Sequence, residues 1–414
     1  MIMEAIVERC CGIDVHKKNI VVCLAVGKSN EKPRTTVKTF STMTRDLLAC
    51  RDWLVSEGCT HAVVESTGVY WKPVFNILED SMEVILANAR DVKNVPGRKT
   101  DVKDCEWLAQ LLRHGLVKGS FIPPKPIREL RDLTRYREKL TQKRSSEINR
   151  LQKFLEDANI KLSSVATDIN GVSARNMIHH LIQDDMSPQE MADLAKGRLR
   201  NKIEELEESL EGYITDHHRL ILKLTLQMIA SYDEAIEQLN TEIEKRMESF
   251  QEESEGLQTI PGVKKKFAER IIAEIGADMS RFPSDAHISS WAGASPGNNE
   301  SAGKRRSGKV TQGNKWLKSA LVEAAWAASK TKNTYLSARY RRLAARKGKK
   351  RAALAVGHTI LVMAYHIIKE HRTYNELGAD YFDKLNEQHL VRRLTSRISA
   401  LGYEVKVEKL PVAA

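Results

Sequence analysis

Recognisable zinc, redox and nucleotide motifs are absent from this 414-residue sequence. The six cysteines form no C-x-x-C pair and no His cluster stands near them, so a zinc site is not expected. No G-x-x-x-x-G-K-[ST] stretch is present, so no P-loop nucleotide site is expected either. We interpret the cysteines as small, buried apolar residues of a protein in a reducing cytoplasm. They are Cys10, Cys11, Cys23, Cys50, Cys59 and Cys105.

Long apolar stretches are missing as well. No run approaches eighteen uncharged apolar residues, and the first residues, MIMEAIVERC, lack a basic region followed by an apolar core. We therefore expect neither a membrane span nor a secretory signal. A hydrophobic content of 42% and a charged content of 29% are typical of a folded, soluble, intracellular protein.

Acidic residues are scarce in one part of the chain. Residues 260–372 contain 23 Lys and Arg but only 7 Asp and Glu, whereas residues 201–256 contain 5 and 15. The net charge of the whole chain is +12, so the basic part carries more positive charge than the chain itself. This distribution predicts a polyanionic partner, most commonly nucleic acid. A solvated basic surface without a partner is the alternative.

The first 120 residues alternate short β-branched runs with helical periodicity, which predicts a mixed α/β sheet. Apolar runs at the start, separated by Lys17 and Lys18, indicate a hairpin. A last helix is expected to begin after Thr100, a plausible N-cap. The expected strands are residues 10–16, 19–26, 34–40, 61–65 and 82–88, and the other expected helices are residues 44–56 and 71–78.

The stretch IPPKP, residues 122–126, is a stiff break where we place a domain boundary. Four regions are predicted: 1–122 as a catalytic domain, 123–255 as a helical coiled-coil linker, 256–372 as a mostly helical C-terminal domain, and 373–414 as a tail.

The linker is expected to contain long helices at residues 128–155 and 206–247, with weaker helices over 160–200. An apolar seam is expected along the second long helix. Antiparallel long helices or a coiled coil between chains fit this pattern, and a helical hairpin within one chain fits it equally. The seam residues are Leu206, Leu210, Tyr213, Leu220 and Ile221.

Residues 257–276, LQTIPGVKKKFAERIIAEIG, have the form of a helix-hairpin-helix, an element that offers backbone N–H groups to a DNA phosphate. Lys264 replaces the usual second glycine, so a plain structural helix–turn–helix fits the stretch as well.

Four acids occupy strand and helix ends in the first region. Asp14 ends the first strand, Glu65 ends a central strand, and Asp101 and Asp104 lie in the first turn of the following helix. Residues 101, 104, 108 and 111 share one helical face, so the aspartates are expected to point where leucines pack. Buried carboxylates need compensating charge, from neighbouring Lys and Arg or from a divalent cation. Two Mg²⁺ ions fit this number of carboxylates and would serve phosphoryl transfer. Each acid alone is also compatible with a structural role.

A second candidate site lies at residues 291–318, WAGASPGNNESAGKRRSGKVTQGNKWLK. Its five glycines predict a loop able to approach a ligand closely. A serine among cations is a plausible nucleophile toward a DNA phosphate, and Ser295, Ser301 and Ser307 are equivalent on chemistry alone. A simple phosphate-binding loop is the alternative. The cations expected to contact nucleic acid are Lys304, Arg305, Arg306, Lys309 and Lys315, with Lys264 and Lys265 from the preceding turn.

The motifs G-I-D-V-H-K, V-x-E-x-T-G-x-Y and K-T-D-x-x-D resemble the RuvC-like domain of the DEDD transposases of bacterial insertion sequences. This is the IS-one-ten family, related to the Piv-type DNA invertases. The resemblance implies a ribonuclease-H-like fold for residues 1–122. It also implies that Asp14, Glu65, Asp101 and Asp104 form a tetrad that binds Mg²⁺.

The second stretch resembles the serine-containing domain of the same family. The matching residues include Gly293, Pro296, Gly303 and Lys304, and Ser301 falls on the family's catalytic serine. The resemblance implies a DNA transposase, or site-specific recombinase, that works through a covalent 5′-phosphoserine link.

The same resemblance implies partners and location. DNA ends and target, a structured guide RNA from the same element, and a homodimer that becomes a tetramer are expected, in the bacterial cytoplasm at the nucleoid and without a membrane. Two alternatives stay open. One is a junction-cleaving nuclease that uses metal-activated water, and the other is a nucleic-acid-binding protein whose carboxylates are inert.

Overall fold

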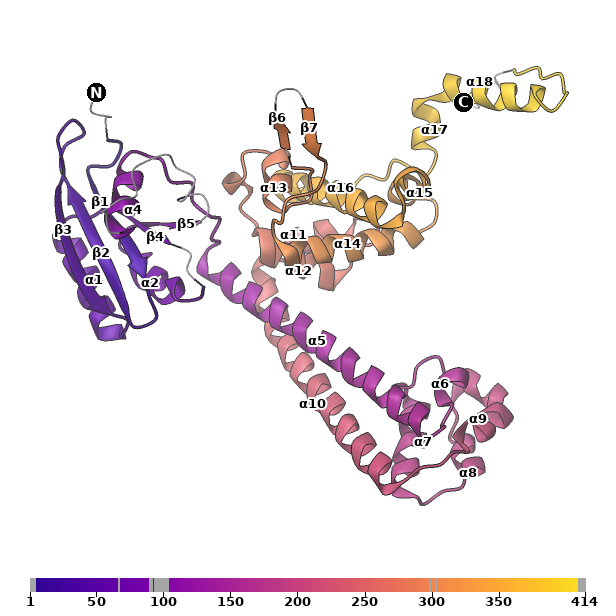
Figure 1. Ribbon diagram of the computed structural model, residues 1–414. Coiled ribbons are helices and arrows are strands. Elements are labelled where there is room, and N and C mark those ends of the chain that lie inside the picture. The colour runs from indigo at the N-terminus through magenta and orange to yellow at the C-terminus, as the bar shows by residue number, and fades with distance from the viewer. Residues whose placement is uncertain are drawn as a thin grey trace. The chain divides into compact units, whose positions relative to one another are not determined.

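The computed structural model describes residues 5–65, 68–88, 92, 104–297, 299–301 and 304–408. The chain divides into two compact units, Met1–Ile122 and Pro123–Ala414. Figure 1 shows the elements of each unit. Asp101 of the predicted tetrad and the expected helix start after Thr100 lie outside the described residues.

The first unit contains the predicted mixed sheet, whose five strands have the order β3-β2-β1-β4-β5. The first three strands are antiparallel neighbours, and β4 and β5 continue parallel to β1. The expected α/β class and strand positions are confirmed, because the β-branched runs pair as the pattern indicated. The strands are β1 (Arg9–Val15), β2 (Asn19–Val26), β3 (Arg34–Ser41), β4 (His61–Glu65) and β5 (Glu83–Ala87).

Helices cover both faces of this sheet. Alternate residues of β1 point to opposite faces, so Cys11, Ile13 and Val15 pack with α1 (Thr44–Ser56) and α2 (Trp71–Leu78). Cys10 lies on the other face with residues of α4 (Asp104–Arg113), the helix that follows β5 in the described chain.

All six cysteines are buried free thiols, as expected. Burial raises the pKa of the Cys50 thiol to about 12, which keeps it protonated and unreactive at neutral pH.

Helix α4 approaches β1 unusually closely at Gly12. A Cβ at Gly12 would overlap the backbone O of Cys105 and N of Ala109, and would lie 2.8 Å from the Leu108 Cβ. Only a residue without a side chain lets the helix backbone sit this close to the strand. Gly12 therefore fixes how near the start of α4 lies to the end of β1.

A buried arginine holds the other end of α4. The side chain of Arg113 is only 2% exposed, and its guanidinium donates to five backbone carbonyls from the segment before β1 and from the β2–β3 connection. The shortest of these bonds reach the carbonyl oxygens of Lys28 at 2.5 Å and Gly27 at 2.9 Å. Since the guanidinium presents five donors, one side chain satisfies a cluster of strand-end carbonyls and ties them to the helix.

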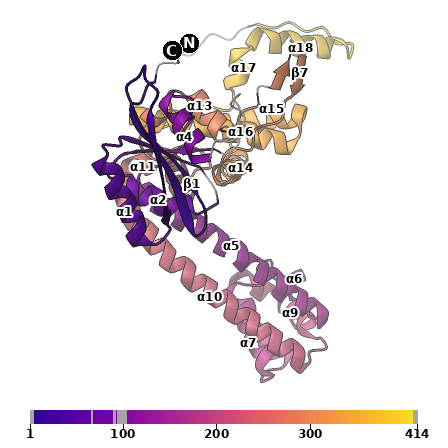
Figure 2. The same cartoon turned by 60° about the vertical axis from the view of Figure 1, so that its left-hand side comes forward.

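The second unit begins with two long helices packed side by side. These are α5 (Lys125–Asp157), with 33 residues, and α10 (Asp216–Met247), with 32 residues. Figures 1 and 2 show them running along each other, with short helices at the far end. The open question of a hairpin within the chain is thereby answered, since the two helices pair intramolecularly. The short helices are α6 (Leu162–Val165), α7 (Val172–Gln183), α8 (Pro188–Asp193), η1 (Gly197–Lys202) and α9 (Ile203–Leu210).

The prediction of one helix over 206–247 is wrong, because the chain breaks between α9 and α10. Gly212 packs against the Ala158 carbonyl, and the Tyr213 N–H donates to that same oxygen at 2.8 Å. Helix α10 then starts at a capping box made by Thr215 and His218. Tyr213 and Leu220 of the expected seam are 80% and 56% exposed.

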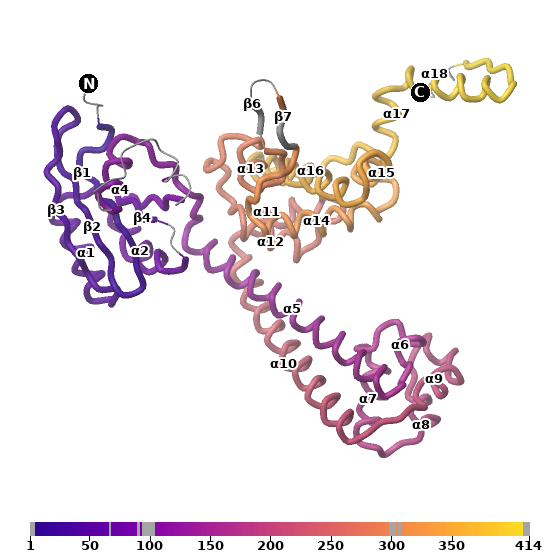
Figure 3. The backbone as a smooth tube through the Cα atoms, viewed as in Figure 1, coloured from indigo at the N-terminus to yellow at the C-terminus, as the bar shows by residue number. Residues whose placement is uncertain are grey.

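The rest of the second unit is helical apart from one hairpin, with α14 and α16 side by side in its core (Figure 3). Its helices are α11 (Gln251–Gln258), α12 (Lys265–Ile275), α13 (Asp285–Trp291), α14 (Lys315–Lys330), α15 (Tyr335–Lys347), α16 (Lys349–Glu370), α17 (Tyr381–Leu385) and α18 (Glu387–Ser399), with one-turn elements η2 (Glu248–Phe250) and η3 (Met279–Arg281). Its strands are β6 (Asn299–Ser301) and β7 (Lys304–Ser307).

Helix α16 is long and apolar enough to cross a membrane by length and composition alone, which the sequence analysis did not anticipate. Many of its apolar residues are buried inside the unit, among them Ile360, Leu361 and Ala364, and others such as Val362 and Met363 are half-buried. Burial of this kind is that of a core helix.

Replacing Gly12 with Ala is expected to destabilise the first unit by about 3 kcal/mol, because the added methyl forces α4 away from β1. Urea denaturation measures the loss. Gly119→Ala is the control, since a Cβ there meets only the Ile85 Cγ2 at 3.2 Å. Equal unfolding midpoints for the two variants would contradict the close packing at Gly12.

Candidate functional site

Two of the predicted acids come from neighbouring parallel strands. Residues 10–13 of β1 pair with residues 61–64 of β4, so Asp14 and Glu65 follow at the same level. Parallel neighbours in a sheet lie about 4.8 Å apart. Side chains alternate along a strand, and Val63 packs on the α4 face, so Glu65 belongs to that face as well. Asp14 shares it by the same alternation, counted from Cys10.

Asp104 is the first residue of α4, the helix that packs closely on β1 because Gly12 has no side chain. The next residue, Cys105, is buried, and its thiol pKa is raised mainly by that burial and in smaller part by the negative charges of Glu106 and Asp14. Asp14 also forms an ion pair with the exposed His16, at 3.1 Å between Oδ2 and Nε2.

One expectation about this helix is wrong in part. Leu108 and Leu111 are buried as the stripe predicted, but Asp104 is exposed. It lies at the open end of the stripe, where a carboxylate needs no buried counter-charge and remains accessible to a ligand.

The donor chemistry of these acids fits a hard divalent cation, which prefers carboxylate oxygens. Among the residues that the structure describes, no group of three or more acidic, His or Cys side chains is close enough to hold a metal ion. The fourth acid, Asp101, is outside that set. The described part of the site therefore has Asp14 and Glu65 at one level on the face of the sheet that α4 covers, and Asp104 at the start of that helix.

The second candidate site is a β-hairpin, so the prediction of a glycine-rich loop over 291–318 is wrong in part. Strands β6 and β7 pair antiparallel, with Ser301 opposite Lys304. Ser301 is the last residue of β6, at the tip side of the hairpin. The other two serines occupy different positions in the hairpin, because Ser295 precedes both strands and Ser307 is the last residue of β7.

The base of this hairpin is closed by backbone contacts between glycines. A Cβ at Gly293 would lie 2.7 Å from the Thr311 oxygen and 2.9 Å from the Gly313 Cα. Gly293 and Gly313 have φ values of 66° and 48°, which favour glycine. These two glycines thus bring the chain ends of the hairpin together, instead of approaching a ligand as the sequence suggested.

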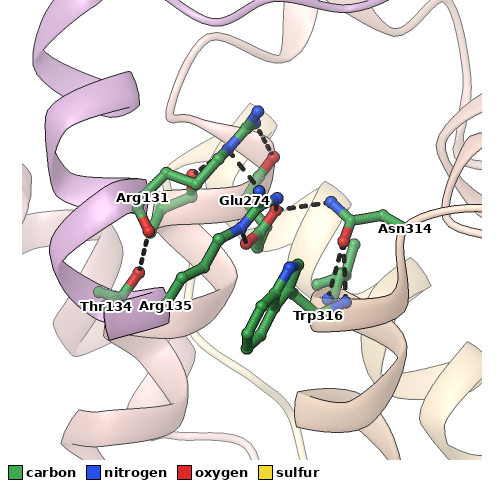
Figure 4. Close-up of polar contacts among 8 residues, drawn as sticks. Arg131, Thr134, Arg135, Glu274, Asn314 and Trp316 are labelled. Carbon is green, nitrogen blue, oxygen red and sulfur yellow. Dashed lines mark hydrogen bonds and ion pairs between the residues drawn. The ribbon is translucent and has the colours of Figure 1, made fainter. Parts of the chain in front are cut away.

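Directly after Gly313, an asparagine anchors the hairpin to the helices below it. The Asn314 Oδ1 caps α14 by accepting from the N–H groups of Trp316 and Leu317. Its Nδ2 donates to the Glu274 Oε2 at 2.5 Å, as Figure 4 shows.

Glu274 lies at the end of α12 and is only 2% exposed. Arg135 donates to both of its carboxylate oxygens, at 2.7 Å each. Arg131 donates to the backbone oxygens of Ala273 and Glu274 (Figure 4). Carbonyls in the last turn of a helix have no N–H partner within the helix, and Arg131 supplies the donor. A buried carboxylate is stable only when paired and hydrogen-bonded in this way. One acid therefore connects α5, α12 and the base of the hairpin.

The predicted nucleic-acid contacts differ in their availability. Lys304, Lys309, Lys315 and Lys264 are exposed. Lys265 is exposed too, but its ammonium pairs with Glu244, and that hydrogen bond raises its pKa. The side chains of Ser301, Arg305 and Arg306 lie outside the described residues.

Cations also surround the half-buried Trp316. Lys315 Nζ lies 5.5 Å, and the Arg135 guanidinium carbon 5.6 Å, from the centre of its ring. Both distances allow a cation–π contact.

The helix-hairpin-helix interpretation meets one obstacle. Gly262, with φ 88°, is packed against α14, where a Cβ would overlap the backbone of Ala324 and Ala328. This glycine is needed for helix packing inside the unit, which is the structural role left open by the sequence.

Sequence reasoning missed Glu274 and Asn314. A signal for Asn314 was present, since Asn before a helical run is a typical N-cap. Glu274 gave none, because its partners lie about 140 and 40 residues away along the chain.

Comparison with known protein families gives two matches. Residues 11–160 match a model described as a transposase, with a name that specifies a DEDD transposase of the IS110 group. Residues 254–341 match the transposase IS116/IS110/IS902 family. No curated relative matches the chain. The first match includes Asp14, Glu65, Asp101 and Asp104, and the second includes the whole hairpin.

Replacing Asn314 with Asp is expected to destabilise the second unit by about 2 kcal/mol. Asp caps a helix as well as Asn does, so the loss comes from setting a second carboxylate against Glu274. Adding Glu274→Gln supplies an amide donor to the new carboxylate at position 314, and the double variant is expected to lose less than the sum of the two single losses. Urea unfolding followed by Trp fluorescence measures all three variants. Additive losses would show that the two side chains do not interact.

Proposed function

Because the chain belongs to the IS110 family of DEDD transposases, we propose that it recombines DNA through a covalent link on Ser301, with divalent metal held by the acids of the first unit. The family assignment itself makes the protein an enzyme that binds DNA, cleaves it and transfers strands. A DEDD transposase domain also depends on a divalent metal.

The observation that supports the metal part of the proposal is the position of Asp14 and Glu65, which stand at one level on adjacent strands. Asp104 begins α4, the helix that packs directly on β1 at Gly12. We propose that Asp14, Glu65, Asp101 and Asp104 together hold Mg²⁺, with two ions as the expected number. When bound, Mg²⁺ would neutralise charge on the phosphate oxygens and help the leaving oxygen to depart. The carboxylates themselves orient the metal and keep the rest of the sheet edge negative.

In the proposed reaction, the Ser301 oxygen attacks the phosphorus of the scissile phosphodiester. The serine proton passes to solvent, the bond to the 3′ oxygen breaks, and that oxygen takes up a proton. The DNA 5′ phosphate is then esterified to Ser301, and the energy of the broken bond is retained without a nucleotide cofactor. A free 3′ hydroxyl next attacks the phosphoserine of the partner duplex, which joins the strands and restores the serine.

The arrangement of the second unit supports a nucleophile at this position. Ser301 is held on a paired strand whose base is fixed by Gly293, Gly313 and Asn314. Lys304 stands opposite it, and the cations of the hairpin would stabilise charge that develops on the phosphorane.

We further propose that the protein acts as a dimer or tetramer on two DNA molecules, guided by a structured RNA of the same element. The support is the excess of positive charge over residues 260–372, which suits simultaneous contact with two nucleic acids.

Trapping of covalent protein–DNA adducts tests the proposed chemistry. The protein, co-expressed with a complete element, is incubated with Mg²⁺, denatured, and analysed by mass spectrometry for the linked peptide. We expect an adduct on Ser301 that is lost in Ser301→Ala and in Asp14→Ala, and that is absent when the metal is removed with a chelator.

Ser295→Ala and Ser307→Ala are the matched controls, because both serines come from the same segment and are expected to leave the adduct intact. Strand cleavage that persists in Ser301→Ala without any adduct would transfer the nucleophilic role to water and replace the recombinase proposal with a metal-dependent nuclease.

A further inference from the structure

A cluster of cations lies where α15 ends and α16 begins, and it includes none of the residues assigned above. Arg346 and Lys347 occupy the last turn of α15, and Lys349, Lys350 and Arg351 the first turn of α16, on either side of Gly348. We call these five residues the basic corner. All five are exposed, and Gly348 has a φ of 79° that allows the sharp turn between the helices.

The surroundings of the basic corner contain no compensating charge in the sequence. The 46 residues between Glu323 and Glu370 include 11 Lys and Arg and not one Asp or Glu. Among the described residues, no carboxylate forms an ion pair with any of the five side chains. The positive field there is therefore not cancelled by neighbouring side chains.

Two further arginines extend the same field along α15. Arg341 donates to the Ser337 carbonyl oxygen at 3.5 Å, and the Arg342 guanidinium carbon lies 5.4 Å from the Phe382 ring centre. Neither of these contacts is with an acidic side chain, so neither contact offsets the positive charge of its arginine. They precede the basic corner on α15 and add to its positive electrostatic potential, and the proposed binding does not require them to contact the ligand.

Local helix energetics disfavour half of this arrangement. Arg346 and Lys347 complement the negative end of the α15 dipole. Lys349, Lys350 and Arg351 instead lie at the positive end of α16, which has no acid in its first turn and no side-chain cap. Three cations at that end oppose the helix dipole, so helix stability does not account for their placement.

We propose that the basic corner binds the phosphate backbone of a DNA duplex, independently of sequence and of the catalytic metal. Five exposed cations within six consecutive residues provide several contacts for the closely spaced phosphates of a duplex. The corner lies outside the first family match and beyond the end of the second at residue 341. The inference rests on the DNA-acting function only for the identity of the partner.

The experiment measures binding of the full-length protein to a 30-base-pair duplex of arbitrary sequence in a chelator, as a function of KCl concentration. The test variant carries Lys349→Gln, Lys350→Gln and Arg351→Gln. If all three contact phosphate, the slope of log K against log salt becomes less steep by about 2.7. Thermal unfolding is expected to be unchanged or slightly improved, since the cations oppose the α16 dipole.

A variant with Arg392→Gln, Arg393→Gln and Arg397→Gln is the matched control, because it removes the same charge from exposed positions of α18. Its salt slope is expected to stay near that of the unchanged protein. Equal slope changes in the two triple variants would overturn the proposal, because only net charge would then matter. A change of about 2 with a single strand and none with the duplex would overturn it too, in favour of single-stranded nucleic acid.

The result is separate from the chemistry of Ser301, since binding is measured without metal and without cleavage. If no Ser301 adduct forms but the two triple variants still differ in salt slope, the basic corner remains a DNA contact. Only the proposed recombination chemistry is then rejected.

Discussion

The contact between α4 and β1 at Gly12 is the constraint on which the first unit depends. Here a helix backbone and a strand backbone meet with no side chain between them, so the position of one determines the position of the other. Arg113 secures the far end of the same helix with hydrogen bonds to strand-end carbonyls. A helix held at both ends has a fixed position on β1, and so does its first residue, Asp104. The proposed metal site needs this kind of placement, because metal coordination tolerates little error in ligand position.

In the second unit, the position of the candidate site is fixed by a buried charged network instead of by close backbone packing. Glu274 is buried among two arginines of α5 and the amide of Asn314 at the base of the hairpin. Removing any one partner leaves buried donors or a buried charge unsatisfied, so the members stabilise one another. Through Asn314 the network reaches the base of the hairpin that carries Ser301. Ser301 thus lies on a short paired strand whose hairpin is anchored at its base by this network.

Local patterns were sufficient for the strands of the first unit and for the acids at their ends. The β-branched run of β2 and the helix over 44–56 were predicted with correct limits, because neighbouring residues determine them. Tertiary contacts explain the failures. The apolar helical periodicity of the sequence continues through Tyr213. The helix nevertheless ends before it, because Gly212 packs against the Ala158 carbonyl and the Tyr213 N–H donates to that oxygen.

The glycines of the second site were misjudged for the same reason. Gly293 and Gly313 contact each other across twenty residues, a pairing that sequence periodicity does not reveal.

The paired helices α5 and α10 have about equal lengths and form an arm of about 50 Å, with the chain leaving and returning at the same end. Such an arm can change length without disturbing what precedes and follows it, provided that both helices lose or gain matching whole turns. Eleven residues from each, about three turns, preserve the facing surfaces. The arm is in this sense an adjustable spacer, whose length evolution can alter independently of either catalytic motif.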